Sequence, residues 1–167
     1  MGELNKPSLG ETAEFLHFNV SHDEGLVVFG ASRHLVGVDC MRCSPRGSRD
    51  TTQFLQQMKA HCTARDWAYI MGVRLPEQQI RRFMRVWTVK EAFVKAIGTG
   101  IYIDPERLEC TFPASGSPQL SLDSIPQTDF HFRLEEEEAP DYVICVCVGP
   151  PSRAIEEYKK CMQPVRE

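Results

Sequence analysis

Residues 87–101 read WTVKEAFVKAIGTGI, and this stretch decides the fold. Its apolar residues recur every three or four positions, which predicts the end of a long helix with one apolar face. The residues of that face are Val86, Val89, Phe93, Ala96 and Ile97. Gly98 and Gly100 should end the helix, because glycine readily adopts the left-handed conformation of a C-cap.

Glu91 and Lys95 are four residues apart, so they share a helix face that lies roughly opposite the apolar one. The helix would then be held by one side and would present a carboxylate and an ammonium group on the other. An ordinary surface ion pair gives the same pattern, and the helix alone favours that simpler interpretation. The rest of the chain has to decide between the two.

The segments on either side of this helix predict an α+β fold, with a mainly antiparallel sheet packed on the long helix. The predicted strands cover residues 15–22, 26–31, 35–39, 107–112, 119–122, 130–134 and 142–148, and the second and third should form a hairpin. The other predicted helices cover residues 51–62, 63–71 and 152–161. We expect one domain over residues 1–150, followed by a C-terminal helix or tail over 151–167.

Composition and cysteine content narrow the class of protein. Hydrophobic residues make up 42% of the chain and charged residues 25%, which is typical of a globular protein. No apolar run reaches the ~20 residues of a membrane helix, and the first residues lack the apolar core of a secretory signal. The seven cysteines are odd in number, which favours free thiols in a reducing compartment, so we expect a cytoplasmic protein. Cys40 and Cys43 have the spacing of half a zinc site, but no second pair completes it.

The net charge of −4 gives no reason to expect a nucleic-acid partner. The charge is unevenly spread, because residues 74–95 are rich in arginine and lysine and residues 135–138 are four consecutive glutamates. The acidic run is most simply a solvated loop. The basic segment is either a solvated face or a surface for an acidic partner or a phosphate.

Three polar residues stand on well-anchored elements: His22 and Asp39 at the ends of predicted strands, and Glu91 on the long helix. Each alone has an ordinary structural explanation. Together, two carboxylates can hold Mg²⁺, which binds few protein carboxylates and completes its shell with water and substrate phosphate. Lys90, Lys95 and His22 can hold phosphate oxygens.

Four short motifs occur in a fixed order around these residues. They are Asn5-Lys6-Pro7, Phe18-Asn19-Val20-Ser21-His22, Val36-Gly37-Val38-Asp39, and Trp87-Thr88-Val89-Lys90-Glu91 through Lys95. In these motifs and their order the chain resembles the 4′-phosphopantetheinyl transferase superfamily, of the two-lobed type. Within it, the chain is most similar to the eukaryotic enzymes named for aminoadipate-semialdehyde dehydrogenase. The resemblance covers residues from about 5 to 112 and fades after that.

The resemblance implies transfer of the 4′-phosphopantetheine group from coenzyme A to a serine of an acyl or peptidyl carrier protein, which is holo-acyl-carrier-protein synthase activity. It implies that Asp39 and Glu91 bind Mg²⁺ and that Lys95 neutralises charge on the diphosphate. Glu91, or a water that it orients, would take the proton of the serine hydroxyl. The implied coenzyme contacts are Lys6, Asn19, Ser21, His22, Lys90 and Lys95.

The chain departs from the family pattern at two positions and in length. Many members carry a third acidic residue two places after the metal-binding aspartate, where this chain has Met41, a poor ligand for a hard cation. Asp23 is the candidate replacement, and Asn5 stands where the family usually has glycine. Because the two-lobed enzymes have a whole lobe before this first motif, we expect a short isoform, a partial gene product, or one lobe that pairs with another.

A missing lobe would leave an apolar face, for which residues 26–29 and 142–148 are candidates, and self-association through that face is expected. Two interpretations compete with an active transferase. One is a non-catalytic fragment that binds coenzyme A or a carrier protein without turnover, and the other is an unrelated thiol-rich interaction domain. For the transferase, we expect Arg81, Arg82 or Arg85 of the basic segment to meet the carrier protein.

Overall fold

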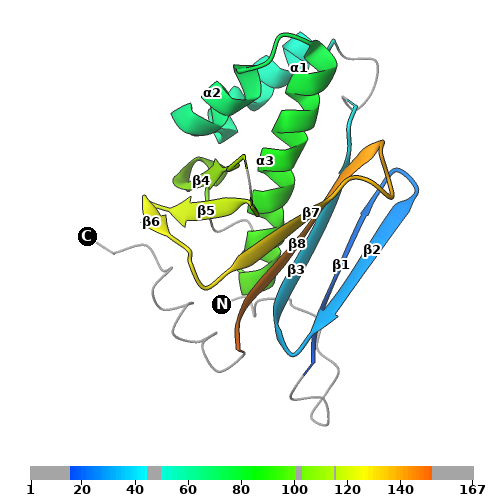
Figure 1. The fold of residues 1–167 in the computed structure, drawn as a ribbon, viewed down its shortest axis with the longest axis vertical. Helices are drawn as coiled ribbons and strands as arrows, with labels where there is room; N and C mark the ends of the chain where they lie inside the picture. The colour runs from blue at the N-terminus through cyan, green and yellow to red at the C-terminus, as the bar shows by residue number, and fades with distance from the viewer. Residues whose placement is uncertain (1–15, 45–49, 101–102, 115, 152–167) are drawn as a thin grey trace.

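The computed structural model describes residues 16–44, 50–100, 103–114 and 116–151 (Figure 1). Its elements, in chain order, are β1 His17–Asp23, β2 Leu26–Ser32, β3 His34–Arg42, α1 Thr51–Met58, η2 Lys59–His61, α2 Ala64–Met71, α3 Pro76–Ile97, η4 Pro105–Arg107, β4 Leu108–Thr111, β5 Gln119–Leu122, β6 Ile125–Pro126, β7 His131–Glu135 and β8 Tyr142–Pro151. The predicted tail over 151–167 lies almost entirely outside the described residues, and its predicted helix over 152–161 lies wholly outside them. Lys6 and its motif also lie outside the described residues.

The long helix α3 ends where the sequence predicts. Pro76 occupies its first turn, where the missing N–H costs nothing. Gly98 forms the C-cap with φ 71°, and its N–H donates to Val94 O at 3.0 Å. All five residues of the predicted apolar face are buried, so the face assignment is confirmed.

Three antiparallel sheets surround α3, which confirms the α+β class with a mainly antiparallel arrangement. Their strand orders are β1-β2, β3-β8-β7 and β4-β5-β6. In Figure 1, α1 and α2 lie at one end of α3, the β4-β5-β6 sheet lies along one side, and the β1-β2 hairpin lies on the other. Among the described residues, no helix is both long and apolar enough to cross a membrane.

The helix α3 packs directly against β3 and β8 because Gly37 leaves room for it. A Cβ atom at Gly37 would lie 2.0 Å from Ala92 O and 2.4 Å from Ala96 N, far inside contact distance. Glycine therefore brings the backbone of α3 against β3, on the strand that carries Asp39. This close approach sets the distance between the residues of the helix and those of the strand.

The predicted hairpin between residues 26–31 and 35–39 is wrong. β2 pairs with β1 through the turn at Glu24 and Gly25, where both residues have positive φ, as tight hairpin turns require. β3 instead pairs with β8, far along the chain, because its residues 35–40 are buried and need a partner strand inside the core. Short-range spacing could not reveal this long-range pairing.

Candidate active site

Asp39 and Lys95 meet between β3 and α3. Lys95 Nζ lies 2.6 Å from Asp39 Oδ1, and the Ser21 hydroxyl donates to the same oxygen at 3.0 Å. Lys95 Nζ also donates to Ser21 Oγ at 3.0 Å. Three elements that are distant in sequence thus bring a carboxylate, an ammonium group and a hydroxyl group into mutual contact.

The second oxygen of Asp39 is the unusual atom of this cluster. Asp39 Oδ2 is buried and has no hydrogen-bond partner among the described residues. Burial raises the pKa of the Asp39 carboxyl above its ordinary value, although the Lys95 charge opposes this. A buried carboxylate oxygen without a donor is costly, so this atom is suited to a ligand that the protein does not itself supply.

Glu91 completes the charge pattern one helical turn before Lys95. Burial raises the pKa of the Glu91 carboxyl, and the neighbouring Asp39 charge raises it further. The two carboxylates therefore interact across the space between β3 and α3. A divalent cation would reduce the repulsion between the two carboxylates and would give Asp39 Oδ2 a partner.

The donor set fits Mg²⁺ but not a cage made only of protein ligands. Within residues 16–44, 50–100, 103–114 and 116–151, no three His, Cys, Asp or Glu residues are grouped so that they could hold a metal ion. Two carboxylates with water and phosphate completing the shell is the arrangement that Mg²⁺ commonly adopts. The predicted third ligand, Asp23, does not join the group: its Oδ2 accepts the backbone N–H of Arg42 at 2.8 Å instead.

Lys90 is not at this site, and its predicted contact with the coenzyme is a wrong assignment. Its side chain is 2% exposed, and its Nζ lies 2.7 Å from Asp66 Oδ2. The same ammonium donates to the carbonyl oxygens of His61 at 3.2 Å and Pro105 at 2.7 Å. Adjacent residues on a helix point about 100° apart, and these contacts show that Lys90 points toward Asp66 rather than toward Asp39.

The remaining predicted coenzyme contacts divide by strand parity, because alternate residues of a strand face opposite sides. His22 is exposed on the outer face of β1, together with Val20. Asn19 and Ser21 are on the inner face, and Asn19 Oδ1 accepts the N–H of Val38 at 2.9 Å. Ser21 therefore faces the charged cluster, whereas His22 faces away from it toward solvent.

The basic segment is largely committed to contacts within the chain. Arg81 Nη1 and Arg85 Nη2 lie 2.8 Å and 2.6 Å from the carboxylate oxygens of Glu136, in the acidic run. Arg82 donates to Tyr69 O at 2.6 Å and lies over the Tyr69 ring. Two arginines of the basic segment thus pair with one glutamate of the acidic run, and all three arginines make contacts within the chain.

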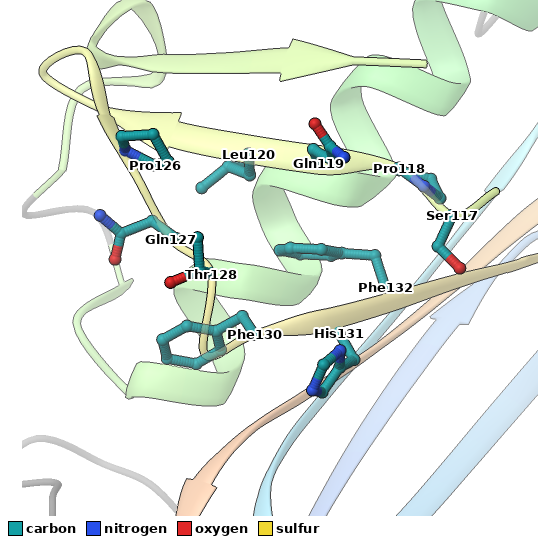
Figure 2. A pocket seen from close by; sticks show the side chains of 10 residues that line it. All are labelled: Ser117, Pro118, Gln119, Leu120, Pro126, Gln127, Thr128, Phe130, His131 and Phe132. Atoms are coloured by element: carbon teal, nitrogen blue, oxygen red, sulfur yellow. The ribbon is translucent and has the colours of Figure 1, made fainter. Parts of the chain in front are cut away.

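A separate cavity of about 340 Å³ lies on the other side of α3 (Figures 1 and 2). Figure 2 shows its apolar wall, formed by Leu120, Phe130 and Phe132, and the amides of Gln119 and Gln127 at its rim. It is lined by neither of the two carboxylates nor by Lys95. This cavity is therefore separate from the charged cluster.

Comparison with known proteins gives the family. The profile of the 4′-phosphopantetheinyl transferase superfamily matches residues 35–147. The chain belongs to this superfamily. The matched range contains Asp39, Glu91 and Lys95, so the charged cluster lies within the family domain.

Individual relatives agree with this assignment. The chain is 35% identical over 126 residues to a phosphopantetheinyl transferase of a Thraustochytrium species, covering 71% of this chain and 44% of the relative. It is 37% identical over 94 residues to the L-aminoadipate-semialdehyde dehydrogenase-phosphopantetheinyl transferase of Pongo abelii, covering 56% and 30%. The chain thus spans less than half the length of these curated relatives.

A solved structure supports the fold. The crystal structure of Thermotoga maritima holo-[acyl-carrier-protein] synthase superposes with a TM-score of 0.51 at 16% identity, covering 69% of this chain and 62% of that chain. At this level of identity the likeness concerns the fold alone.

Sequence reasoning missed two residues that support the site. Asp66 forms a capping box with Thr63 at the start of α2, and it is also the buried partner of Lys90. Gly37 was read as part of a motif, whereas its lack of a side chain is what admits α3. The capping pattern was a signal for the first residue, but no local signal reveals either tertiary contact.

Proposed function

We propose that this chain carries the catalytic site of a Mg²⁺-dependent phosphopantetheinyl transferase, which moves the 4′-phosphopantetheine group from coenzyme A to a serine of a carrier protein. One observation carries the proposal: Asp39 with its unpartnered oxygen, Glu91 and Lys95 converge between β3 and α3. Membership of the transferase superfamily supplies the reaction class.

Asp39 and Glu91 would hold the metal, which when bound supplies positive charge to the diphosphate of coenzyme A. Lys95 lies beside Asp39 and would add a second positive charge next to the diphosphate. Its flexible side chain allows the ammonium group to move from Asp39 toward a phosphate oxygen. Glu91, directly or through a water, would accept the proton of the attacking serine.

Of the other implied coenzyme contacts, His22 lies on the outer face of β1, away from the charged cluster, so it would contact a part of the coenzyme remote from the diphosphate. Lys6 lies outside the described residues. The carrier protein would be held by a surface other than Arg81 and Arg85, since these pair with Glu136. No disulfide joins the six described cysteines, which fits a reducing cytoplasmic compartment.

A non-catalytic fragment that binds coenzyme A or a carrier protein without turnover is the second candidate. The chain spans 44% and 30% of two curated relatives. Turnover by this chain separates the two candidates.

Self-association is part of the proposal, because β2 exposes apolar side chains. Val27 and Phe29 are 68% and 65% exposed, and Val20 on the paired strand is 45% exposed. The other predicted apolar candidate, residues 142–148, is core instead, with Val143, Cys145 and Cys147 buried. Light scattering should show a species larger than a monomer, and Phe29→Ser should reduce it, whereas a monomer at all concentrations would contradict this part.

The transfer reaction is tested by mass spectrometry of a carrier protein incubated with this chain, coenzyme A and Mg²⁺. We expect the carrier serine to gain one phosphopantetheine group, and EDTA to stop the reaction. Glu91→Gln should reduce the rate at least about 100-fold, as loss of a general base does. Binding of coenzyme A without any carrier modification would support the non-catalytic candidate instead.

A further inference from the structure

Three side chains on the inner face of β1 each accept a backbone N–H of β3 (Figure 1 shows the two strands side by side). The pairs are Asn19 Oδ1 with Val38 N at 2.9 Å, Ser21 Oγ with Cys40 N at 3.3 Å, and Asp23 Oδ2 with Arg42 N at 2.8 Å. Both members of each pair advance by two residues, which is the period of a strand. The contacts therefore form a regular ladder between the side chains of one strand and the backbone of the other.

This ladder provides hydrogen-bond acceptors for backbone N–H groups of β3 that β8 does not bind. On one edge β3 pairs with β8, and in an antiparallel pair only alternate residues direct their N–H groups to that partner. The other alternate N–H groups lie on the opposite edge, and leaving them buried without an acceptor is costly. The β1-β2 hairpin meets this edge with side chains rather than with its own backbone.

The hairpin comes close enough because β2 has a glycine at the contact. A Cβ atom at Gly30 would lie 2.6 Å from Val38 Cγ1. Gly30 is the strand partner of Asn19, so the close approach and the first contact of the ladder occur at the same level of the hairpin. The absence of a side chain at Gly30 and the hydrogen bond of Asn19 together allow the hairpin to pack closely against the edge of β3.

The ladder encloses Asp39. Val38 and Cys40, on either side of Asp39, are both held by it. Ser21 links the ladder to the charged cluster, since its hydroxyl donates to Asp39 Oδ1 and accepts from Cys40 N and Lys95 Nζ. The backbone that carries the carboxylate is thus fixed from the side opposite to β8.

We propose that Asn19, Ser21 and Asp23 are positioning residues, which hold the edge of β3 at alternate amides and so fix the Asp39 carboxylate beside Lys95 and Glu91. The inference rests on the proposed function for its catalytic meaning, but the ladder itself does not. It assigns Asp23 to the backbone of β3 rather than to a metal ion. His22, like Val20, alternates with these three residues and faces outward.

Asp23 offers a matched pair of variants. Asp23→Asn and Asp23→Ala both remove the negative charge, but only the asparagine keeps an oxygen that can accept from Arg42 N. Hydrogen exchange measured by NMR, without metal or coenzyme, should show the Arg42 amide exchanging roughly tenfold faster in Asp23→Ala, the factor for one lost hydrogen bond, and near the wild-type rate in Asp23→Asn.

Asn19 tests the link to the carboxylate. Asn19→Ala should accelerate exchange at Val38 and move the carboxyl ¹³C signal of Asp39, although the two side chains are not hydrogen-bonded to each other. Val20→Ala, on the outer face of the same strand, is the control and should change neither. A local effect at one amide distinguishes positioning from a general loss of stability, which would accelerate all β3 amides together.

Two results would overturn the inference. One is equal exchange at Arg42 in Asp23→Ala and Asp23→Asn, and the other is an Asp39 carboxyl signal that does not respond to Asn19→Ala. Both measurements are made without substrate, so they decide the ladder even if the chain proves to transfer nothing. Failure of the transfer assay alone would count against the proposed function and not against the positioning role.

Discussion

Two lysines of α3, five residues apart, each pair with an aspartate of another element, and the two pairs differ in their surroundings. Lys90 and Asp66 lie 2.7 Å apart with side chains 2% and 0% exposed, and Lys95 and Asp39 lie 2.6 Å apart with side chains 29% and 7% exposed. We call these the closed pair and the open pair. Similar chemistry and similar distances therefore serve two different purposes on one helix.

Hydrogen bonding explains the difference. In the closed pair, Lys90 meets three acceptors, and Asp66 also accepts the backbone N–H groups of Thr63 and Cys110. In the open pair, Asp39 keeps one buried oxygen with no described partner, beside a second carboxylate. A fully satisfied pair can only support the fold, whereas an incompletely satisfied one retains the capacity to bind.

Breaking the closed pair should have the largest effect on stability. Lys90→Met leaves the Asp66 charge buried without its partner, and we expect a loss of about 3–5 kcal/mol in the free energy of unfolding, measured with urea. Lys59→Met is the control, since Lys59 is exposed and contacts only the ring of Trp67 in the described contacts; it should cost less than about 1 kcal/mol. Equal losses in both variants would remove the structural role of the closed pair.

Breaking the open pair should affect the reaction rather than the fold. Because the Lys95 side chain is partly exposed, water can take its place beside Asp39, and Lys95→Met should lower the free energy of unfolding clearly less than Lys90→Met does. The transfer rate should fall about 100-fold or more, since a charge near the diphosphate is lost. An active Lys95→Met variant, or one as unstable as Lys90→Met, would contradict the comparison.

The pH dependence of stability should follow from Glu91. Its pKa is raised by burial and by Asp39 above the ordinary value of 4.5, so the folded state binds this proton more tightly than the unfolded state does. Stability therefore falls as pH rises from that value through the folded pKa. Glu91→Gln removes this contribution, so its stability relative to wild type should increase with pH over that range in urea unfolding. A stability difference between Glu91→Gln and wild type that does not change with pH would show that the pKa of Glu91 is not raised in the folded protein.

The smallest effect should come from the exposed ion pair between α3 and the acidic run. A double-mutant cycle on Arg85→Ala and Glu136→Ala should give a coupling of about 1 kcal/mol or less, because both side chains are partly solvated. That coupling should weaken further at high salt, whereas the cost of Lys90→Met should hardly change with salt. Equal salt responses would show that burial does not separate these pairs.

The sequence predicted the elements well, because their signals are local. The limits of α3 follow from Pro76 and Gly98, and the capping box from Thr63 and Asp66. The convergence of Asp39 with Lys95 came from the order of the motifs and not from any spacing. Three features of the structure that depend on tertiary contacts were not predicted from the sequence. They are the pairing of β3 with β8, the burial of Lys90 beside Asp66, and the hydrogen bond from the Arg42 backbone N–H to Asp23.

The basic segment shows the same limit. Its arginines and the glutamates at 135–138 are separate features in the sequence, and only the fold brings Arg81 and Arg85 to Glu136. A local charge count cannot tell a surface for a partner from one half of an internal ion pair.

The central claim is that the open pair with Glu91 forms a metal-dependent site for coenzyme A. Calorimetric titration of coenzyme A with and without Mg²⁺ tests it most directly, on wild type, Asp39→Ala and Glu91→Ala, with Glu136→Ala as an acidic control outside the site. We expect Mg²⁺ to strengthen binding to wild type and to Glu136→Ala, and to have no effect on the two site variants. An unchanged Mg²⁺ dependence in both Asp39→Ala and Glu91→Ala would contradict the account.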